Sequence, residues 1–153
     1  MHILPVPSVP EISLYTAHPG SGLRNLDNKD SQACDHPPYW AYRWAGGTVL
    51  ARYILDHPET VQGLRIIDLG AGSGIVGIAA AKAGAGTVTA VDTDFRAVTA
   101  NRMNAAVNAV DISLVCGDFL NEGPPVADVI AVGDLFYAAE LAEKVTAYLR
   151  RCV

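Results

Sequence analysis

The stretch Asp68-Leu69-Gly70-Ala71-Gly72-Ser73-Gly74 is the most informative part of the sequence. It ends the short apolar run 64–69, which predicts a buried strand, and it precedes the Ala-rich run 75–83, which predicts a helix. Glycines between a strand and a helix let the backbone take positive φ and approach a ligand closely. The N-terminus of the following helix favours negative charge. We therefore expect a ligand-binding loop here.

Strands and helices alternate on both sides of this loop. In chain order, the apolar pattern predicts a helix around 49–54, strands at 64–69, 87–91, 112–115 and 127–132, and helices at 75–83, from the cap Asp94 to about Asn108, and over 138–152. This alternation predicts an α/β, Rossmann-like fold with a mainly parallel sheet and helices on both faces. Tyr53, Met103 and Tyr148 are expected in its core.

The fourth predicted strand, 127–132, is apolar throughout, as expected for a strand covered on both faces. Only the helix over 138–152 follows it in this sequence, so no further segment is expected to pair with its far edge. An apolar strand at an open edge is a site for pairing with another chain. We therefore expect either a sheet that is incomplete after this helix or a homo-oligomer joined through the open edge.

The rest of the sequence indicates one domain with an N-terminal arm. Residues 1–38 hold six prolines, and only 11–16 alternates like a strand, so we expect an irregular arm before a domain over 39–153. No apolar run is long enough to span a membrane. The net charge is −5 and the longest basic cluster is Arg150-Arg151, which argues against a nucleic-acid partner.

The cysteine usage favours a reducing compartment. Cys34, Cys116 and Cys152 form an odd set with no paired spacing, and the N-terminus lacks the pattern of a signal peptide, so we expect the cytoplasm. Cys34 and His36 lie close together, but no second pair completes a zinc site. We therefore expect no metal.

Two kinds of ligand fit the glycine loop. Gly72, Gly74 and Gly77 match G-x-G-x-x-G, and Asp92 ends the next strand, where it suits the ribose of a dinucleotide such as NAD. Asp68 favours another ligand, because a carboxylate repels a pyrophosphate and pairs with an ammonium group. S-adenosylmethionine carries an ammonium and a sulfonium and no phosphate. We therefore expect S-adenosylmethionine as the cofactor.

Acidic residues follow three successive strands. Asp92 can accept from both ribose hydroxyls, Asp118 from an adenine amino group, and Phe119 can pack on the adenine ring. Together with Asp68, they lie at the carboxyl ends of predicted parallel strands, where ligands bind in such sheets. For Asp118 alone, a Gly-Asp turn explains the sequence equally well.

These motifs resemble the class I (seven-strand) S-adenosylmethionine-dependent methyltransferases over residues 44–153. Asp134-Leu135-Phe136-Tyr137 resembles the D-x-x-Y signature of the seven-strand protein-lysine methyltransferases. The segments 38–47 and 50–53 are similar to one branch, the electron-transfer-flavoprotein β-subunit lysine methyltransferases, and the segment 5–12 is similar to bacterial members of that branch.

The resemblance implies a protein-lysine N-methyltransferase that acts on the electron transfer flavoprotein β subunit and whose last sheet strands are missing here. It implies catalytic roles for Asp134, as hydrogen-bond acceptor for the lysine nitrogen, and for Tyr137, as an aromatic wall. From position alone, Asp134 fits an N-cap of the last helix equally well. The implied cofactor-binding residues are Trp44, Asp68, Gly70, Gly72, Ser73, Gly74, Asp92, Asp118 and Phe119. Methylation of another protein or of a small-molecule amine, and an inactive cofactor-binding module, remain alternatives.

Overall fold

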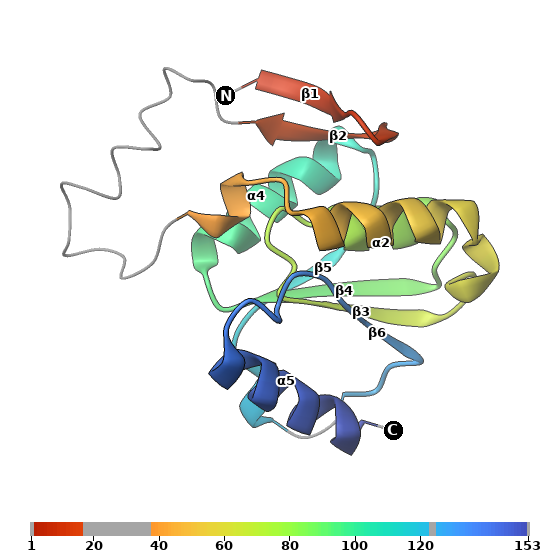
Figure 1. Cartoon of the computed structure of the whole chain (residues 1–153). Coiled ribbons are helices and arrows are strands. Elements are labelled where there is room, and N and C mark those ends of the chain that lie inside the picture. The colour runs from red at the N-terminus through yellow and green to blue at the C-terminus, as the bar shows by residue number, and fades with distance from the viewer. Residues whose placement is uncertain (1, 17–37, 123–124, 153) are drawn as a thin grey trace, which may run out of the picture.

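The computed structural model describes residues 2–16, 38–122 and 125–152 (Figure 1). Cys34 and His36, for which we expected no metal site, lie outside the described residues. The strands are β1 (His2–Val6), β2 (Val9–Thr16), β3 (Arg65–Leu69), β4 (Thr87–Asp92), β5 (Ser113–Cys116) and β6 (Val129–Val132). The helices are α2 (Ala45–Asp56), α3 (Ile75–Lys82), α4 (Phe95–Val107) and α5 (Ala139–Arg151), with 3-10 turns η2 (Tyr39–Ala41), η3 (Pro58–Thr60) and η4 (Phe119–Asn121).

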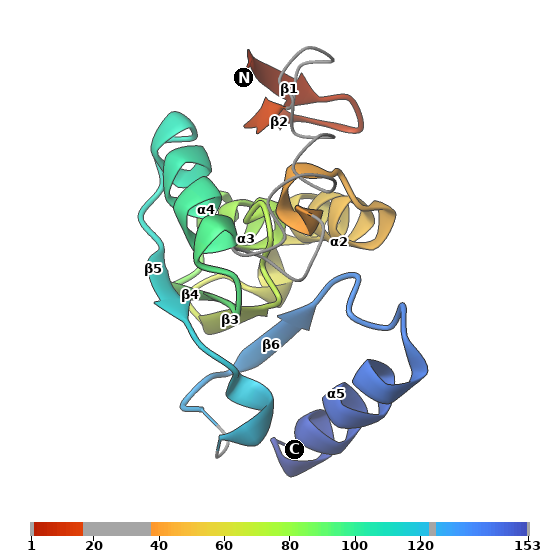
Figure 2. The same cartoon turned by 90° about the vertical axis from the view of Figure 1, so that its left-hand side faces the viewer.

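Four strands form a parallel sheet in the order β5-β4-β3-β6. Figure 2 shows α2, α3 and α4 on one face of this sheet and α5 on the other. The expected α/β class, the parallel sheet and the helices on both faces are therefore confirmed. Because all four strands run the same way, their carboxyl ends meet at one edge, and the segments that follow them gather there.

The alternation of side chains along β3 gives each face of the sheet its own core. Ile66 packs in the cluster under α2 and α3, whereas Ile67 and Leu69 pack in the cluster under α5. Tyr148 anchors α5 in this second cluster and is almost fully buried. Burial of its ring stabilises the fold, but the Tyr148 hydroxyl has no hydrogen-bond partner among the described residues, which offsets part of that gain. Asp68 lies two residues after Ile66 and so on the same face of the sheet, and its side chain points toward α3.

The N-terminal segment differs from the expected irregular arm. Residues 2–16 form the antiparallel hairpin β1–β2, which contains the predicted strand at 11–16. Four apolar side chains of the hairpin are buried in the same cluster as those of α2 and α3, namely Val6, Val9, Ile12 and Leu14. Pro5 in β1 and Pro10 in β2 are tolerated because both strands of a two-stranded sheet are edge strands. For residues 2–16 the expectation of an irregular arm was wrong, because the contacts that order the hairpin are distant in sequence. Residues 17–37 of the predicted arm lie outside the described residues.

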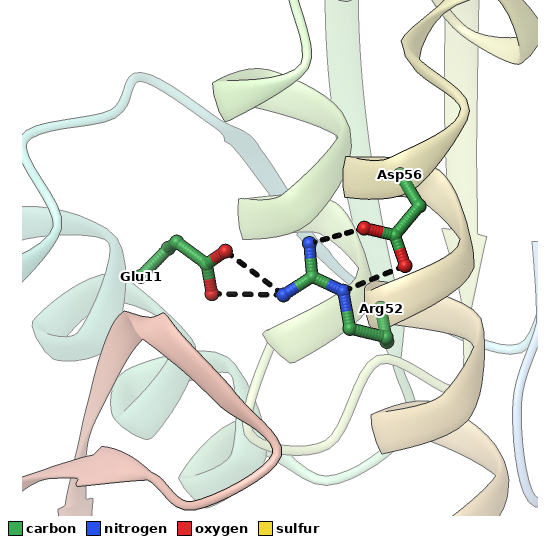
Figure 3. A network of polar contacts seen from close by, with 3 residues as sticks. All are labelled: Glu11, Arg52 and Asp56. Carbon is green, nitrogen blue, oxygen red and sulfur yellow. Dashed lines mark hydrogen bonds and ion pairs between the residues drawn. The ribbon is translucent and has the colours of Figure 1, made fainter.

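An ion-pair network also fastens the hairpin to α2 (Figure 3). The Arg52 guanidinium on α2 lies 2.8 Å from a Glu11 carboxylate oxygen of β2 and 2.8 Å from an oxygen of Asp56 one turn further along α2. Exposed pairs of this kind contribute little to stability, because water and salt screen the charges. The network therefore contributes more to the orientation of the hairpin than to stability.

Strand β6 is the edge of the sheet within the described residues, where it pairs only with β3. Val129 and Ala131 pack in the cluster under α2 and α3, whereas Ile130 and Val132 pack against the cluster under α5, so the expectation of a strand covered on both faces is confirmed. Only Ala131 is fully buried, and the other three residues stay partly exposed at this edge. Self-association through this edge stays a prediction. No helix among the described residues is long and apolar enough to cross a membrane.

Candidate functional site

A cavity of about 540 Å³ lies at the carboxyl ends of the sheet strands. The site residues predicted from sequence that line it are Trp44, Asp68, Gly70, Gly72, Ser73, Asp92, Asp118, Phe119, Asp134 and Tyr137. Gly74 is the exception: it is the N-cap residue of α3, and its Cα faces the Asn101 side chain of α4. Residues from five distant segments of the chain thus meet around one space. Their role in ligand binding stays a prediction, but the structure brings them together.

The glycine loop turns tightly between β3 and α3. Gly70, Gly72 and Gly74 all have positive φ, and the Gly70 and Ala71 N–H groups both donate to the Val91 carbonyl of β4, at 2.9 and 3.0 Å. The expected backbone conformation is therefore confirmed. These hydrogen bonds tie the loop to β4.

Asp68 is a buried carboxyl group in the cavity wall, with only 2% of its surface exposed. One of its oxygens, Oδ2, accepts a hydrogen bond from the Gly77 N–H of α3 at 2.8 Å. Burial raises the pKa of Asp68 to about 7, the Gly77 N–H opposes this rise, and the nearby Asp92 adds to it. A cationic ligand group would therefore relieve an unfavourable negative charge.

Asp68→Asn is expected to remove a pH-dependent loss of stability. Folding raises the pKa of the Asp68 carboxyl group from its ordinary value of 3.8 to about 7. Between these values the folded protein keeps a proton that the unfolded chain releases, so the free energy of unfolding falls as pH rises and then levels off above the folded pKa. Urea unfolding of both proteins between about pH 5 and pH 8 should show the stability of wild type falling relative to that of Asp68→Asn. A difference that is constant with pH would contradict the raised pKa.

Asp92 connects β4 to the glycine loop. Its Oδ2 accepts from the Gly72 N–H at 2.8 Å and its Oδ1 accepts from the Asp94 N–H at 3.0 Å. Burial raises its pKa, and these backbone hydrogen bonds lower it. A carboxylate offers about four acceptor positions, so Asp92 can hold the loop and still accept from two hydroxyl groups.

Asp118 stabilises a turn, which is one of the two roles that its sequence context allowed. Its Oδ1 accepts from the Leu120 N–H at 3.0 Å, and its Oδ2 accepts from the Asn121 side chain at 2.6 Å, so it caps the turn η4. Phe119 packs against the cluster under α5. Both residues also line the cavity, so the turn geometry presents them to a ligand.

Asp134 binds the N-terminus of α2 rather than that of the last helix. Its two oxygens accept from the Gly46 and Gly47 N–H groups at 3.0 and 2.6 Å. The N-cap residue of α5 is Ala138, and no side chain caps this helix. The alternative role of Asp134, as the N-cap of the last helix, is therefore wrong. A Cβ on Gly46 would lie 2.7 Å from Asp134 Oδ1, which explains why a glycine stands there. Asp134 thus joins the loop after β6 to the start of α2.

An aromatic rim formed by Tyr39, Tyr42, Trp44 and Tyr137 lies at the cavity mouth. The Tyr39 ring centroid is 5.8 Å from that of Trp44 and 6.0 Å from that of Tyr137, and the Trp44 indole donates to the Tyr39 carbonyl at 2.8 Å. These rings keep between 42% and 65% of their surface exposed. Exposed π faces beside the Asp134 carboxylate favour a cationic partner. The sequence predicted Trp44 and Tyr137 here but not Tyr39 or Tyr42 as their partners.

Sequence reasoning missed two further contributions to the site. Leu14 of the hairpin lines the cavity, and Asn104 of α4 donates to the Ser73 carbonyl of the glycine loop at 2.8 Å. Asn101, Asn104 and Asn108 recur along one face of α4 and are buried, which is rare for asparagine in a helix. The spacing of these asparagines was the signal from which the role of Asn104 could have been predicted. No pattern in the sequence around Leu14 predicts that it lines the cavity.

Comparison with known proteins shows the family of this chain. The family model described as ribosomal protein L11 methyltransferase (PrmA) matches residues 47–147. The chain is 38% identical over 116 residues to the electron transfer flavoprotein beta subunit lysine methyltransferase of Rattus norvegicus, covering 75% of this chain and 46% of that protein. For the Homo sapiens protein of the same name the identity is 37%, with 75% of this chain and 44% of that protein covered. The chain thus spans less than half the length of these curated relatives.

A solved structure shows the same fold. The ribosomal protein L11 methylase of Lactobacillus delbrueckii subsp. bulgaricus superposes with a TM-score of 0.58 at 31% sequence identity, covering 73% of this chain and 57% of that chain. The family match extends over more than half of the chain and includes the glycine loop, Asp92, Asp118 and Asp134. The chain therefore belongs to the ribosomal protein L11 methyltransferase (PrmA) family.

Proposed function

We propose that the cavity binds S-adenosylmethionine and that the protein transfers its methyl group to a lysine side chain of another protein. The observation that carries this proposal is the buried Asp68 beside the glycine loop. A pyrophosphate at this loop would add negative charge next to a carboxyl group that already resists ionisation. An ammonium group at the same place is attracted to it.

The residues present fit S-adenosylmethionine. A cavity of about 540 Å³ is in the range of cofactor sites. Asp68 and the glycine loop would hold the amino-acid part, Asp92 the ribose hydroxyls, and Asp118 with Phe119 the adenine. When bound, the cofactor supplies an electrophilic methyl group on a cationic sulfur.

The protein must then prepare the acceptor. A lysine amine has an ordinary pKa of about 10.4, so at pH 7 only roughly one in a thousand is neutral. The aromatic rim receives the protonated lysine chain against its π faces, and the small neutral fraction of the amine is the form that reacts. Asp134 keeps free acceptor positions beside its bonds to Gly46 and Gly47, and it accepts a hydrogen bond from the neutral amine, which orients the lone pair toward the cavity. The released proton passes to solvent at the exposed rim.

For the substrate we propose the electron transfer flavoprotein β subunit, because the rat and human relatives carry that name and align over 75% of this chain. Ribosomal protein L11 is the second candidate, favoured by the family match and by the structure from Lactobacillus delbrueckii. Incubation of each candidate with isotopically labelled S-adenosylmethionine and this protein, followed by mass spectrometry, tests both. We expect labelled methyl groups on lysines of the flavoprotein subunit. Label on L11 alone would favour the second candidate, and label on neither would contradict a protein substrate of this kind.

Asp92→Ala is expected to weaken binding of S-adenosylhomocysteine roughly tenfold to a hundredfold, because two ribose hydroxyls lose their acceptor. The variant also loses the bond to the Gly72 N–H, which adds to the effect. Asp92→Asn keeps one acceptor oxygen, so its affinity should lie between those of wild type and Asp92→Ala. Isothermal titration calorimetry measures all three affinities. Equal affinities would place the ribose elsewhere.

A further inference from the structure

Asn104 bridges two segments that are far apart in sequence. Its Oδ1 accepts from the Tyr15 N–H of the hairpin at 2.8 Å, and its Nδ2 donates to the Ser73 carbonyl of the glycine loop at 2.8 Å. The side chain is only 2% exposed, so neither bond competes freely with water. One buried amide thus connects β2 to the loop that lines the cavity.

The chemistry of the amide makes these two bonds dependent on each other. An N–H group can pair only with the amide oxygen, and a carbonyl can pair only with the amide nitrogen. The Tyr15 N–H therefore fixes which end of the Asn104 amide faces the loop. Without the docked hairpin, a rotation of the amide would turn its oxygen toward the Ser73 carbonyl, which is unfavourable in a buried place.

The hairpin is docked by further contacts on the same helix. Asn108, one turn beyond Asn104, accepts from the Ser13 N–H at 3.0 Å and donates to the Ser13 carbonyl at 2.7 Å. Its amide thus satisfies the β2 edge as a neighbouring strand would. Between these two contacts, the buried Leu14 side chain lines the cavity. The hairpin is therefore part of the site wall, held at the same edge of α4 that supports the loop.

We propose that Asn104 is a positioning residue through which the N-terminal hairpin holds the glycine loop in its ligand-binding shape. The consequence for ligand affinity rests on the proposed binding of S-adenosylmethionine, whereas the coupling of hairpin and loop does not. Docking of the hairpin and binding at the loop favour each other, as two events that stabilise the same arrangement must.

Asn104→Asp tests the proposal, because a carboxylate still accepts from the Tyr15 N–H but cannot donate to Ser73. The matched control is Asn108→Asp, which makes the same change one turn away and alters a hairpin contact without touching the loop. Amide hydrogen exchange of the ligand-free proteins reports on the loop through the Gly72 and Gly74 N–H groups, which are hydrogen-bonded to Asp92 and Ala71. Calorimetry with S-adenosylhomocysteine gives the affinity.

We expect Asn104→Asp to speed exchange of the two loop amides by about tenfold or more and to weaken ligand binding by a similar factor. In Asn108→Asp the loop exchange and the affinity should stay within about twofold of wild type. Equal effects of the two variants on loop exchange and affinity would overturn the proposal and leave Asn104 a structural residue. If wild type failed to bind S-adenosylhomocysteine, the proposed function would fail, but loop exchange would still decide the coupling.

A second pair of variants tests the hairpin side of the bridge. Tyr15→Pro removes the N–H that donates to Asn104, on the edge of β2 that faces α4, and leaves Asn104 itself unchanged. Ser13→Pro is the control, because it removes only the N–H that donates to Asn108. We expect faster loop exchange in Tyr15→Pro than in Ser13→Pro. Equal loop exchange in these two variants would contradict transmission through Asn104.

Discussion

Gly74→Ala is expected to lower the free energy of unfolding by roughly 2–5 kcal/mol and to abolish ligand binding at the glycine loop. Gly74 has a φ of +82°, which alanine adopts only with strain, and a Cβ there would overlap with the side chain of the buried Asn101. The added methyl group would force the Asn101 side chain, which is 1% exposed, out of its packed position. Urea unfolding and calorimetry with S-adenosylhomocysteine measure the two effects.

Gly63→Ala is the matched control for this variant. Gly63 has a similar φ of +72°, but nothing lies within 4 Å of the added Cβ. It should therefore show only the conformational cost, about 1–2 kcal/mol, with ligand affinity unchanged. If Gly63→Ala destabilised the protein as much as Gly74→Ala, the overlap with Asn101 would not contribute to the loss of stability.

Asp134→Ala is expected to reduce methyl transfer about a hundredfold or more while S-adenosylhomocysteine still binds. Asp134 follows β6, on the side of the cavity next to the aromatic rim, so its loss affects the acceptor and not the donor. The variant also frees the Gly46 and Gly47 N–H groups at the start of α2, which should lower stability by about 0.5–2 kcal/mol. Labelled methyl transfer and calorimetry on the same preparation separate these effects.

Asp134→Asn distinguishes the two roles of this residue. Asparagine keeps an acceptor oxygen for one of the two N–H groups, so the variant should recover part of the stability that alanine loses. It has no negative charge and only one acceptor oxygen, so activity should remain low. Activity that returns together with stability would reduce Asp134 to a helix cap. Loss of cofactor binding and activity in parallel would make it a donor-site or folding residue.

The strands, the glycine loop and the acids of the site could be predicted because their signals are local. A buried strand that ends in Asp68 and a run of glycines specifies its own turn, and the cap of α4 by Asp94 is two residues from its partner Arg96. Parallel alternation then brings Asp68, Asp92 and Asp118 to one edge of the sheet. Each step depends on neighbours in sequence or on a general rule of sheet topology.

The contacts that the sequence did not reveal join distant segments. Asp134 lies 88 residues from Gly46, and Asn104 lies 89 residues from Tyr15, so only the folded chain shows these partners. Helical periodicity also cannot tell a core face from an exposed one when apolar residues lie on both. Tyr53 and Met103, expected in the core, are 50% and 41% exposed, whereas Tyr148 is buried as expected. The cytoplasmic location and the absence of a nucleic-acid partner stay predictions.

The most direct test of the cofactor site is isothermal titration calorimetry of the protein with S-adenosylhomocysteine and, under the same conditions, with NAD. The proposed function predicts that S-adenosylhomocysteine binds to one site per chain and that NAD does not bind. It also predicts that Asp92→Ala weakens the first interaction. Binding of NAD in preference to S-adenosylhomocysteine would contradict the role of Asp68 and with it the proposed methyl transfer.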